Sequence, residues 1–359
     1  MNKKLNLLQV YRGIAAILVV LCHANHILTR EFNKNTLLQI FHFGWIGVDF
    51  FFVLSGFIIF YIHQYDIGKP NKLKSFIVKR FIRIYPLYWI ILASKILVSI
   101  FTSSKDTISQ PGADEIIKAF LLIPQDRSIL ETNFIGVSWT LSYEIFFYCL
   151  FATLILLNTK ICKAVIFIWI VGIILSFLNI LPIGKNFILM FIFDEHNLEF
   201  VLGCLAAYII SKFKFQFKRL LIYASIFILI LSVINTKYGE YDVSGISSLI
   251  AYGIPFTFLI IGSVYLEMSS KINVPLILIY IGDASYSIYL THGFFLNNIS
   301  KFTSKLTKYN ILSNYTSDNI IALITVVMAV VMGCFVHTYL EKLLIANLKN
   351  KVFAQIHGK

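Results

Sequence analysis

Charged residues are scarce in this chain of 359 residues: they make up 14% of it, whereas hydrophobic residues make up 58%. A soluble domain carries about 25% charged residues. The composition and a mean hydropathy of +0.79 therefore exclude a soluble globular protein and indicate a polytopic membrane protein. The net charge of +13 does not indicate nucleic-acid binding, because no basic run is long enough or interleaved with aromatic residues.

Cysteines are few and scattered, and no pair of the five has the spacing of metal ligands. An odd number does not make a disulfide framework, so we interpret them as small core residues. The first apolar segment has no A-x-A-like cleavage site, and the large Leu21 precedes its cysteine where a lipoprotein signal needs a small residue. We therefore expect this segment to be retained as a membrane helix.

Ten apolar segments approach the roughly 20 residues that a membrane-spanning helix needs. The sixth is the weakest, because "DEHN" (Asp194–Asn197) interrupts the apolar run before it, so a re-entrant piece could feed a short span. No loop is long enough for a separate soluble domain. The sequence thus predicts an all-α, polytopic membrane helical bundle at 1–345 and a short basic tail at 346–359. The predicted spans are approximately 10–28, 43–63, 82–101, 134–157, 164–181, 197–211, 219–235, 245–266, 276–298 and 319–341.

Lysine and arginine are distributed unequally between the two sides of the predicted bundle. If the N-terminus is cytoplasmic, the inside segments hold 18 of these residues and the outside segments hold 10. Acidic residues show the opposite bias, with three inside and eleven outside. The positive-inside rule therefore places both termini in the cytoplasm, and the inner surface has room for an anionic cytosolic ligand.

The first span, "YRGIAAILVVLCHANHI", contains Arg12 and His23, which are eleven residues apart. At 100° per residue both side chains lie on one helix face, about 16 Å apart along the axis. Ionisable residues in a span are costly and usually face a cavity or a partner. A snorkelling arginine and a hydrogen-bonded core histidine would explain the pair equally well. His26 has no further residues at ligand spacing beside it, so we expect no metal site.

Two carboxylates lie inside predicted spans. Asp49 stands among aromatic residues in "GWIGVDFFFVLSGFII", and Glu144 lies about one turn inside "GVSWTLSYEIFFY". An unpaired buried carboxylate is costly, so Asp49 is expected to have a partner, with Arg12, His23 or Arg83 as candidates. A purely structural ion pair is the alternative.

Three cations cluster at the predicted cytoplasmic mouth of the third span: Lys79, Arg80 and Arg83 in "FIVKRFIRIYPLYWI". Arg80 and Arg83 are neighbours on one helix face and could form a guanidinium fork for phosphates. Anchoring by the positive-inside rule is the alternative explanation.

A polar stripe follows the ninth span, "LIYIGDASYSIYLTHGFF", in which Tyr286, Tyr289 and His292 recur at intervals of three. Hydrogen bonding within the core would explain these residues as well. Together the spans hold more buried polarity than a scaffold needs. Composition alone leaves two classes open, a transporter and an intramembrane enzyme.

At these residues the chain resembles the acyltransferase-3 family of membrane acyltransferases, which O-acetylate bacterial surface glycans. The shared stretches occur in order, from Arg12 to about Glu341: "YRGIAAILVVLCH", "GVDFFFVLSGFII", "KRFIRIYPLYW", "WTLSYEIFFY", "FVLG" and "GDASYSIYLTH". Two positions depart from the family pattern. Gln9 replaces an acidic residue, which removes a candidate partner for Arg12, and Ile145 stands where a second carboxylate often follows.

The resemblance implies a ten-helix membrane fold, a cytosolic acyl-CoA donor and an acceptor outside the cytoplasm. By this resemblance His23 corresponds to the family's catalytic histidine, and Arg12 corresponds to the arginine that is paired with it. Arg80 and Arg83 correspond to the basic motif for donor binding or site architecture. An acetyl donor is expected only because the family favours it.

We therefore expect an O-acetyltransferase of the bacterial inner (plasma) membrane that uses acetyl-CoA and no metal. The expected acceptor is a saccharide or a lipid-linked glycan, and the oligomeric state stays open.

Direct transfer and an acyl-His23 intermediate are equally consistent with the sequence. The main alternative is a carrier or flippase for a lipid-linked sugar or small anion; a sensor or scaffold is the third. The expected roles are donor binding by Lys79, Arg80 and Arg83; general base catalysis by His23, with Arg12 and with Asp49 or Glu144 as orienting group; and substrate or oxyanion contacts by Tyr286, Tyr289 and His292.

Overall fold

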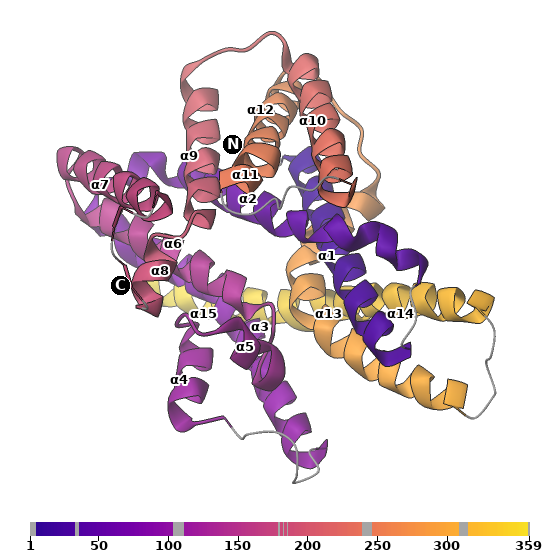
Figure 1. Ribbon diagram of the computed structural model, residues 1–359. Helices are drawn as coiled ribbons and strands as arrows, with labels where there is room; N and C mark the ends of the chain where they lie inside the picture. The colour runs from indigo at the N-terminus through magenta and orange to yellow at the C-terminus, as the bar shows by residue number, and fades with distance from the viewer. Residues whose placement is uncertain are drawn as a thin grey trace. The chain divides into compact units, whose positions relative to one another are not determined.

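The computed structural model describes residues 5–32, 36–102, 111–178, 180, 181, 183, 184, 186–238, 246–308 and 315–357. Within these ranges the chain is a succession of helices with no strand (Figure 1), so the predicted all-α fold is confirmed. In chain order the elements are α1 (Asn6–Phe32), η1 (Leu37–Trp45), α2 (Ile46–His63), η2 (Gln64–Asp66), η3 (Pro70–Lys72), α3 (Leu73–Thr102), α4 (Ala113–Leu121), α5 (Arg127–Asn133), α6 (Ser138–Leu156), α7 (Thr159–Phe177), α8 (Phe187–Ile192), α9 (His196–Lys212), α10 (Lys218–Tyr238), α11 (Ile246–Ser248), η4 (Leu249–Gly253), α12 (Ile254–Ser269), α13 (Leu276–Lys308), α14 (Tyr315–Val336), η5 (His337–Glu341) and α15 (Lys342–His357).

Eight helical segments of the described chain are long and apolar enough to cross a membrane, which confirms a polytopic bundle. The other two predicted spans coincide with α9 and α13. Helix α9 has only 17 residues, and the polar stripe of α13 lowers its hydropathy. The eight segments are Asn6–Phe32, Leu37–Asp66, Pro70–Val98, Ser138–Leu156, Thr159–Phe177, Lys218–Lys237, Leu249–Ser269 and Asp318–Asn350.

Several predicted boundaries shift in the structure. Helix α3 begins at Leu73, nine residues before the predicted span, so the cluster Lys79–Arg83 lies within the helix. Long arginine and lysine side chains allow this, because their aliphatic stems pack on apolar surface while the charge reaches water. The interruption at 194–197 is in part a link and in part helix: α8 ends at Ile192, and α9 already begins at His196. Helix α15 runs through the predicted division at residue 345. Of the two predicted segments, the following residues lie outside the described ranges: 1–4, 33–35, 103–110, 179, 182, 185, 239–245, 309–314, 358 and 359.

The chain divides into two compact units, each built from three separate segments. Unit 1 comprises Met1–Ala15, Ile46–Phe76 and Tyr143–Gly282. Unit 2 comprises Ala16–Trp45, Ile77–Ser142 and Asp283–Lys359.

Unit 1 is held together by close helix packing and by a helix cap. Helices α2 and α9 approach so closely that a Cβ atom on Gly203 would lie 1.9 Å from the carbonyl oxygen of Val53. The carboxylate of Glu267 in α12 accepts hydrogen bonds from the backbone N–H groups of Asn6 and Leu7, at 2.9 and 3.1 Å. These donors have no partner within the first turn of α1, so the carboxylate stabilises that end both by hydrogen bonding and through the helix dipole.

In unit 2, α4 docks on α3 through three side-chain donors. The hydroxyl of Tyr88 donates to the carbonyl oxygen of Ala119 at 2.8 Å, and the indole of Trp89 donates to that of Phe120 at 2.8 Å. Tyr85 bonds the next carbonyl, that of Leu121, at 3.1 Å. The last carbonyls of a helix have no partner within it, so α3 caps the C-terminal end of α4.

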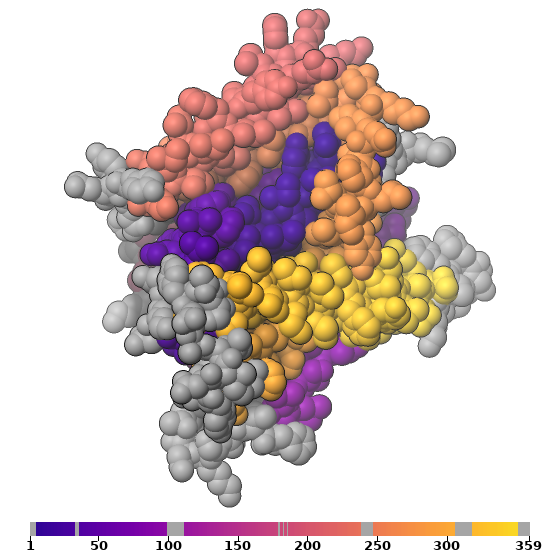
Figure 2. All heavy atoms as spheres, turned by 90° about the vertical axis from the view of Figure 1, so that its right-hand side faces the viewer, coloured from indigo at the N-terminus to yellow at the C-terminus, as the bar shows by residue number. Residues whose placement is uncertain are grey.

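The outward face of α14 is apolar along its length. It forms part of the surface seen in Figure 2, where the helix is yellow. It belongs to a span that is long and apolar enough to cross a membrane, and one face exposes large aliphatic and aromatic side chains at helical spacing. Such a face fits contact with lipid hydrocarbon. The exposed side chains are Ile320, Leu323, Ile324, Val327, Met328, Val331 and Phe335.

Candidate active site

Two histidines from different helices meet in unit 2. The ring centroids of His23 in α1 and His292 in α13 are 4.9 Å apart. His23 Nδ1 lies 2.9 Å from the carbonyl oxygen of Val19, one turn earlier. A carbonyl oxygen can only accept, so Nδ1 bears the proton and Nε2 keeps a lone pair. The local helix therefore fixes His23 in the tautomer that a general base requires.

His292 has the same arrangement. It is fully buried, and its Nδ1 donates to the carbonyl oxygen of Tyr289 at 2.6 Å. Within the described residues its Nε2 has no hydrogen-bond partner. A buried ring nitrogen without a partner costs free energy, so the position is one where a ligand or a water would add a hydrogen bond.

The hydroxyl of Tyr289 connects this pair to α6. It lies 3.0 Å from the hydroxyl oxygen of Thr140, which donates its own proton to the carbonyl oxygen of Val137 at 2.9 Å. Because Thr140 has a single proton, Tyr289 is the donor between the two hydroxyls. One turn earlier, Tyr286 donates to the carbonyl oxygen of Ile84 in α3 at 2.9 Å.

The predicted polar stripe of α13 therefore faces the interior of unit 2. Its three members contact three different helices: Tyr286 meets α3, Tyr289 meets α6 and His292 meets α1. Both tyrosine hydroxyl protons are already engaged. The oxyanion role stays a prediction, and it requires one of these bonds to be exchanged for the substrate.

A cation lies over an aromatic ring where α5 and α6 begin. The guanidinium carbon of Arg127 is 3.7 Å from the ring centroid of Trp139. Asp126 caps α5 by accepting from the N–H and the hydroxyl of Ser128, at 2.8 and 2.6 Å. These hydrogen bonds stabilise the carboxylate and lower the pKa of Asp126 below its usual value.

The predicted donor-binding cations differ in their surroundings. Lys79 is exposed, whereas Arg80 and Arg83 are half-buried. Arg83 forms an ion pair of 3.0 Å with Glu341, and its guanidinium carbon lies 5.4 Å from the ring centroid of Tyr286. Arg83 is one of the three candidate partners of Asp49 in the sequence, but in the structure it pairs with Glu341.

Unit 1 holds the other predicted site residues. Arg12 donates to the amide oxygen of Gln9 at 3.0 Å, so the expectation that Gln9 removes a partner for this arginine is wrong. An amide oxygen accepts from a guanidinium although it has no charge. Asp49 is buried and lies 3.4 Å from the hydroxyl of Ser248. The carboxylate of Glu144 accepts a short hydrogen bond from the hydroxyl of Tyr148.

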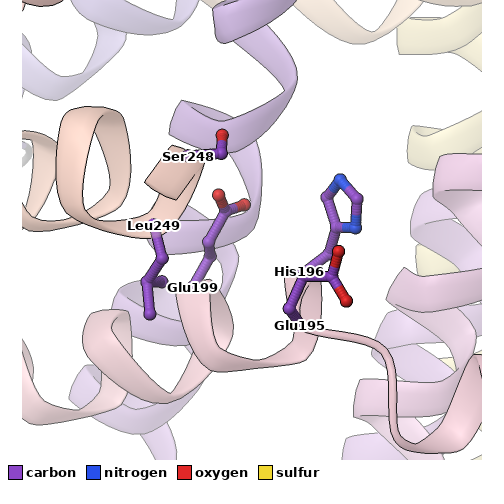
Figure 3. Close-up of a pocket in the computed structure, with 5 residues that line it drawn as sticks. All are labelled: Glu195, His196, Glu199, Ser248 and Leu249. Carbon is purple, nitrogen blue, oxygen red and sulfur yellow. The ribbon is translucent and has the colours of Figure 1, made fainter. Parts of the chain in front are cut away.

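A small acidic pocket lies at the start of α9 (Figure 3). Glu199 is 2% exposed, points toward Ser248 in this view, and has no hydrogen-bond partner for Oε2 within the described residues. His196 Nδ1 forms a hydrogen bond of 2.6 Å with the carboxylate of Asp194. Nothing in the sequence indicated this pocket: Glu195 and His196 belong to the predicted interruption, and Glu199 to the weak sixth span. The pocket is lined by Glu195, His196, Glu199, Ser248 and Leu249.

Sequence reasoning also missed the role of Glu341, which it counted only as one of the few inside acidic residues. An acid at the end of an apolar span, on the side rich in cations, is a usable sign of a buried partner. His337 and Ser287, which also bond it, have no such sign, because either residue fits an ordinary core hydrogen bond. Within the described part of the chain no three His, Cys, Asp or Glu side chains are grouped to hold a metal ion.

Comparison with known proteins gives a consistent result. Residues 6–339 match the family described as acyltransferase domain. The exopolysaccharide production protein ExoZ of Rhizobium meliloti (strain 1021) is 25% identical over 283 residues, which cover 73% of this chain and 79% of that protein. No solved structure matches.

Two other relatives carry O-acetyltransferase in their names. "Putative O-acetyltransferase SACOL0978" of Staphylococcus aureus (strain COL) is 28% identical over 328 residues, 81% of this chain. The match covers 51% of that protein, so this chain spans about half its length. The peptidoglycan O-acetyltransferase OatA of Listeria monocytogenes is 32% identical over 92 residues, 25% of this chain and 13% of that protein.

Proposed function

This chain belongs to the acyltransferase family that it matches over residues 6–339, and we propose that it transfers an acetyl group from cytosolic acetyl-CoA to a saccharide hydroxyl. The names of the relatives support an O-linked product and a saccharide acceptor: one is an exopolysaccharide production protein and another a peptidoglycan O-acetyltransferase. The acceptor would be extracytoplasmic or lipid-linked, and the protein would lie in the bacterial inner membrane.

The observation that best supports this chemistry is the tautomer of His23. With its proton on Nδ1 and bonded to the Val19 carbonyl, the ring presents a basic Nε2. A general base takes a proton in one step and returns it in the next, and this lone pair is positioned on the ring for that role. Beside it His292 offers a second buried Nε2 lone pair, which could accept from an acceptor hydroxyl.

In the proposed reaction His23 Nε2 takes the proton of the acceptor hydroxyl as its oxygen attacks the thioester carbonyl carbon. The carbon–sulfur bond then breaks, and His23 returns the proton to the CoA thiolate. Asp49 or Glu144 is proposed to orient or stabilise the imidazolium, with Arg12 paired to the histidine. A covalent acyl-His23 route balances equally, with acetyl passing to Nε2 before it passes to the acceptor.

Donor binding is assigned to the basic start of α3, where Lys79, Arg80 and Arg83 lie within one and a half turns. The excess of lysine and arginine on the predicted inner side favours an anionic donor from the cytosol. Guanidinium groups suit phosphate because they present paired donors in a fixed plane.

The test measures release of CoA from acetyl-CoA, and acetyl transfer to glycan, by the full chain in detergent micelles. His23→Ala should lower both rates by at least about 100-fold, the usual contribution of a general base. The matched control is His26→Ala, which removes an exposed ring from the next turn of the same helix and should retain activity. Transport of a lipid-linked sugar that survives His23→Ala, with no donor turnover by the wild type, would replace the enzyme by a carrier.

A further inference from the structure

Glu341 is the centre of a buried polar network in unit 2. Its carboxylate is 2% exposed and accepts from three side chains. Oε1 accepts from Arg83 Nη1 at 3.0 Å, while Oε2 accepts from the Ser287 hydroxyl at 2.7 Å and from His337 Nδ1 at 2.6 Å. One carboxylate thereby connects α3, α13 and η5.

The backbone at Glu341 is unusual. Residues His337–Glu341 form a single π-helical turn between α14 and α15. Such turns are rare, occur inside otherwise regular helices and are frequent at functional sites. Here the turn contains the carboxylate of Glu341 and one of its three donors, His337.

Two contacts hold the guanidinium of Arg83 in place. Glu341 holds the guanidinium at Nη1, and the ring of Tyr286 lies 5.4 Å from its central carbon. Tyr286 is itself fixed by its hydrogen bond to Ile84. The Arg83 side chain is nevertheless 35% exposed, and Glu341 accepts from its Nη1 alone, so the pair leaves the other N–H donors of the guanidinium to bind a ligand.

We propose that Glu341 is a positioning residue for the acyl donor: it fixes the plane of the Arg83 guanidinium so that the remaining N–H donors meet a phosphate of acyl-CoA. This inference rests on the proposed function, which assigns Arg83 to donor binding. A guanidinium held in the orientation it needs loses less conformational entropy when the phosphate binds. His337 and Ser287 hold the carboxylate in turn.

The expected signature is specific to the phosphates of the donor. Removing the carboxylate charge with Glu341→Gln should raise the KM for acetyl-CoA and the Kd for CoA by about tenfold or more. The KM for S-acetylpantetheine, which has no phosphate, should stay within about twofold of the wild type, because Arg83 has nothing to bind in it. A merely structural role would impair both donors equally.

The two residues should also act as one unit. In the Arg83→Ala background, Glu341→Gln should add little to the loss of CoA binding, since groups that act through one another are non-additive. The matched control is Glu267→Gln, which neutralises another buried carboxylate, one bonded to backbone N–H groups at the start of α1. It should leave the Kd for CoA unchanged.

Glu341→Asp provides the same test with the charge retained, for the case in which the glutamine variant does not fold. The shorter side chain should shift the guanidinium and weaken CoA binding, while melting temperature reports a retained fold. Titration calorimetry with CoA needs no turnover, so it tests the positioning role even where acetyl transfer is absent and the proposed function fails. A wild type that does not bind CoA, variants that bind it normally, or equal losses for both donors would overturn the proposal.

Discussion

Gly203→Ala should destabilise unit 1, because the contact between α2 and α9 has no room for a methyl group. The added Cβ would lie 1.9 Å from the carbonyl oxygen of Val53 and 2.7 Å from the backbone nitrogen of Phe57. The contact is equally close from the side of α2, where a Cβ on Gly56 would lie 2.0 Å from the carbonyl oxygen of Phe200 in α9. Small residues let two helix backbones approach this closely in a membrane.

The size of the effect follows from these distances. Side-chain Cβ atoms essentially never approach another atom to under 3.0 Å, so the helices must separate by about 1.1 Å at Gly203. The obstructing atoms belong to backbone and cannot rotate away as a flexible side chain would. Overpacking usually costs about 1–3 kcal/mol. We expect the upper end of that range here, about 3 kcal/mol.

The assay is thermal unfolding of the purified protein in detergent micelles, read together with the rate of CoA release. Gly293→Ala is the matched control, since it adds the same methyl group in the interior of α13, where no atom lies within 4 Å. Alanine favours a helix over glycine by about 1 kcal/mol, so this variant should melt at or slightly above the wild type. If Gly203→Ala also melts no lower than the wild type, the close approach of α2 and α9 is refuted.

Three further predictions follow. Thr140→Val should lower the free energy of unfolding by about 1–3 kcal/mol in thermal melts, because it removes the acceptor of the buried Tyr289 hydroxyl. Adding Tyr289→Phe should recover most of that loss, and a double variant that recovers nothing would contradict the assigned hydrogen bond. Arg12→Lys keeps the charge but loses the planar group that bonds Gln9, so kcat should fall about tenfold, whereas full activity would show that charge alone suffices. The pKa of Asp126 is lower in the folded than in the unfolded protein, where it is about 4. The cap therefore stabilises α5 fully at pH values above this unfolded pKa, and the stabilisation is lost as the pH falls through the folded pKa. Hydrogen exchange of the α5 amides should therefore speed up between pH 5 and about 3 relative to other helices, and an unchanged ratio would argue against the cap.

Much of the fold could be predicted from one-dimensional patterns. In a bilayer every backbone polar group must bond within the chain, so an apolar run of about 20 residues is a helix. The ends were harder to place. Helix α3 begins nine residues before its predicted span, because Lys79 and Arg80 continue a helix that hydropathy alone would end. The interruption before the weak sixth span was predicted at "DEHN", and α9 starts within those four residues.

The candidate site was predicted where its geometry is local to one helix. Residues three apart on a helix share a face, so the spacing of Tyr286, Tyr289 and His292 is enough to assign them to one polar stripe. Their partners could not be assigned in this way, since the stripe meets a different helix at each turn. The proton position on His23 also depends on helical geometry, which brings its ring to the Val19 carbonyl one turn earlier.

The sequence by itself determined that this is a helical membrane protein with the acyltransferase motifs in order, because hydropathy and helical spacing act over neighbouring residues. Only the tertiary structure decided that Arg83 pairs with Glu341, 258 positions away. Candidate charges along the chain are chemically equivalent, so no pattern of residue types selects among them. The selection comes from packing, which brings one carboxylate within hydrogen-bonding distance of three donors and keeps that group out of water.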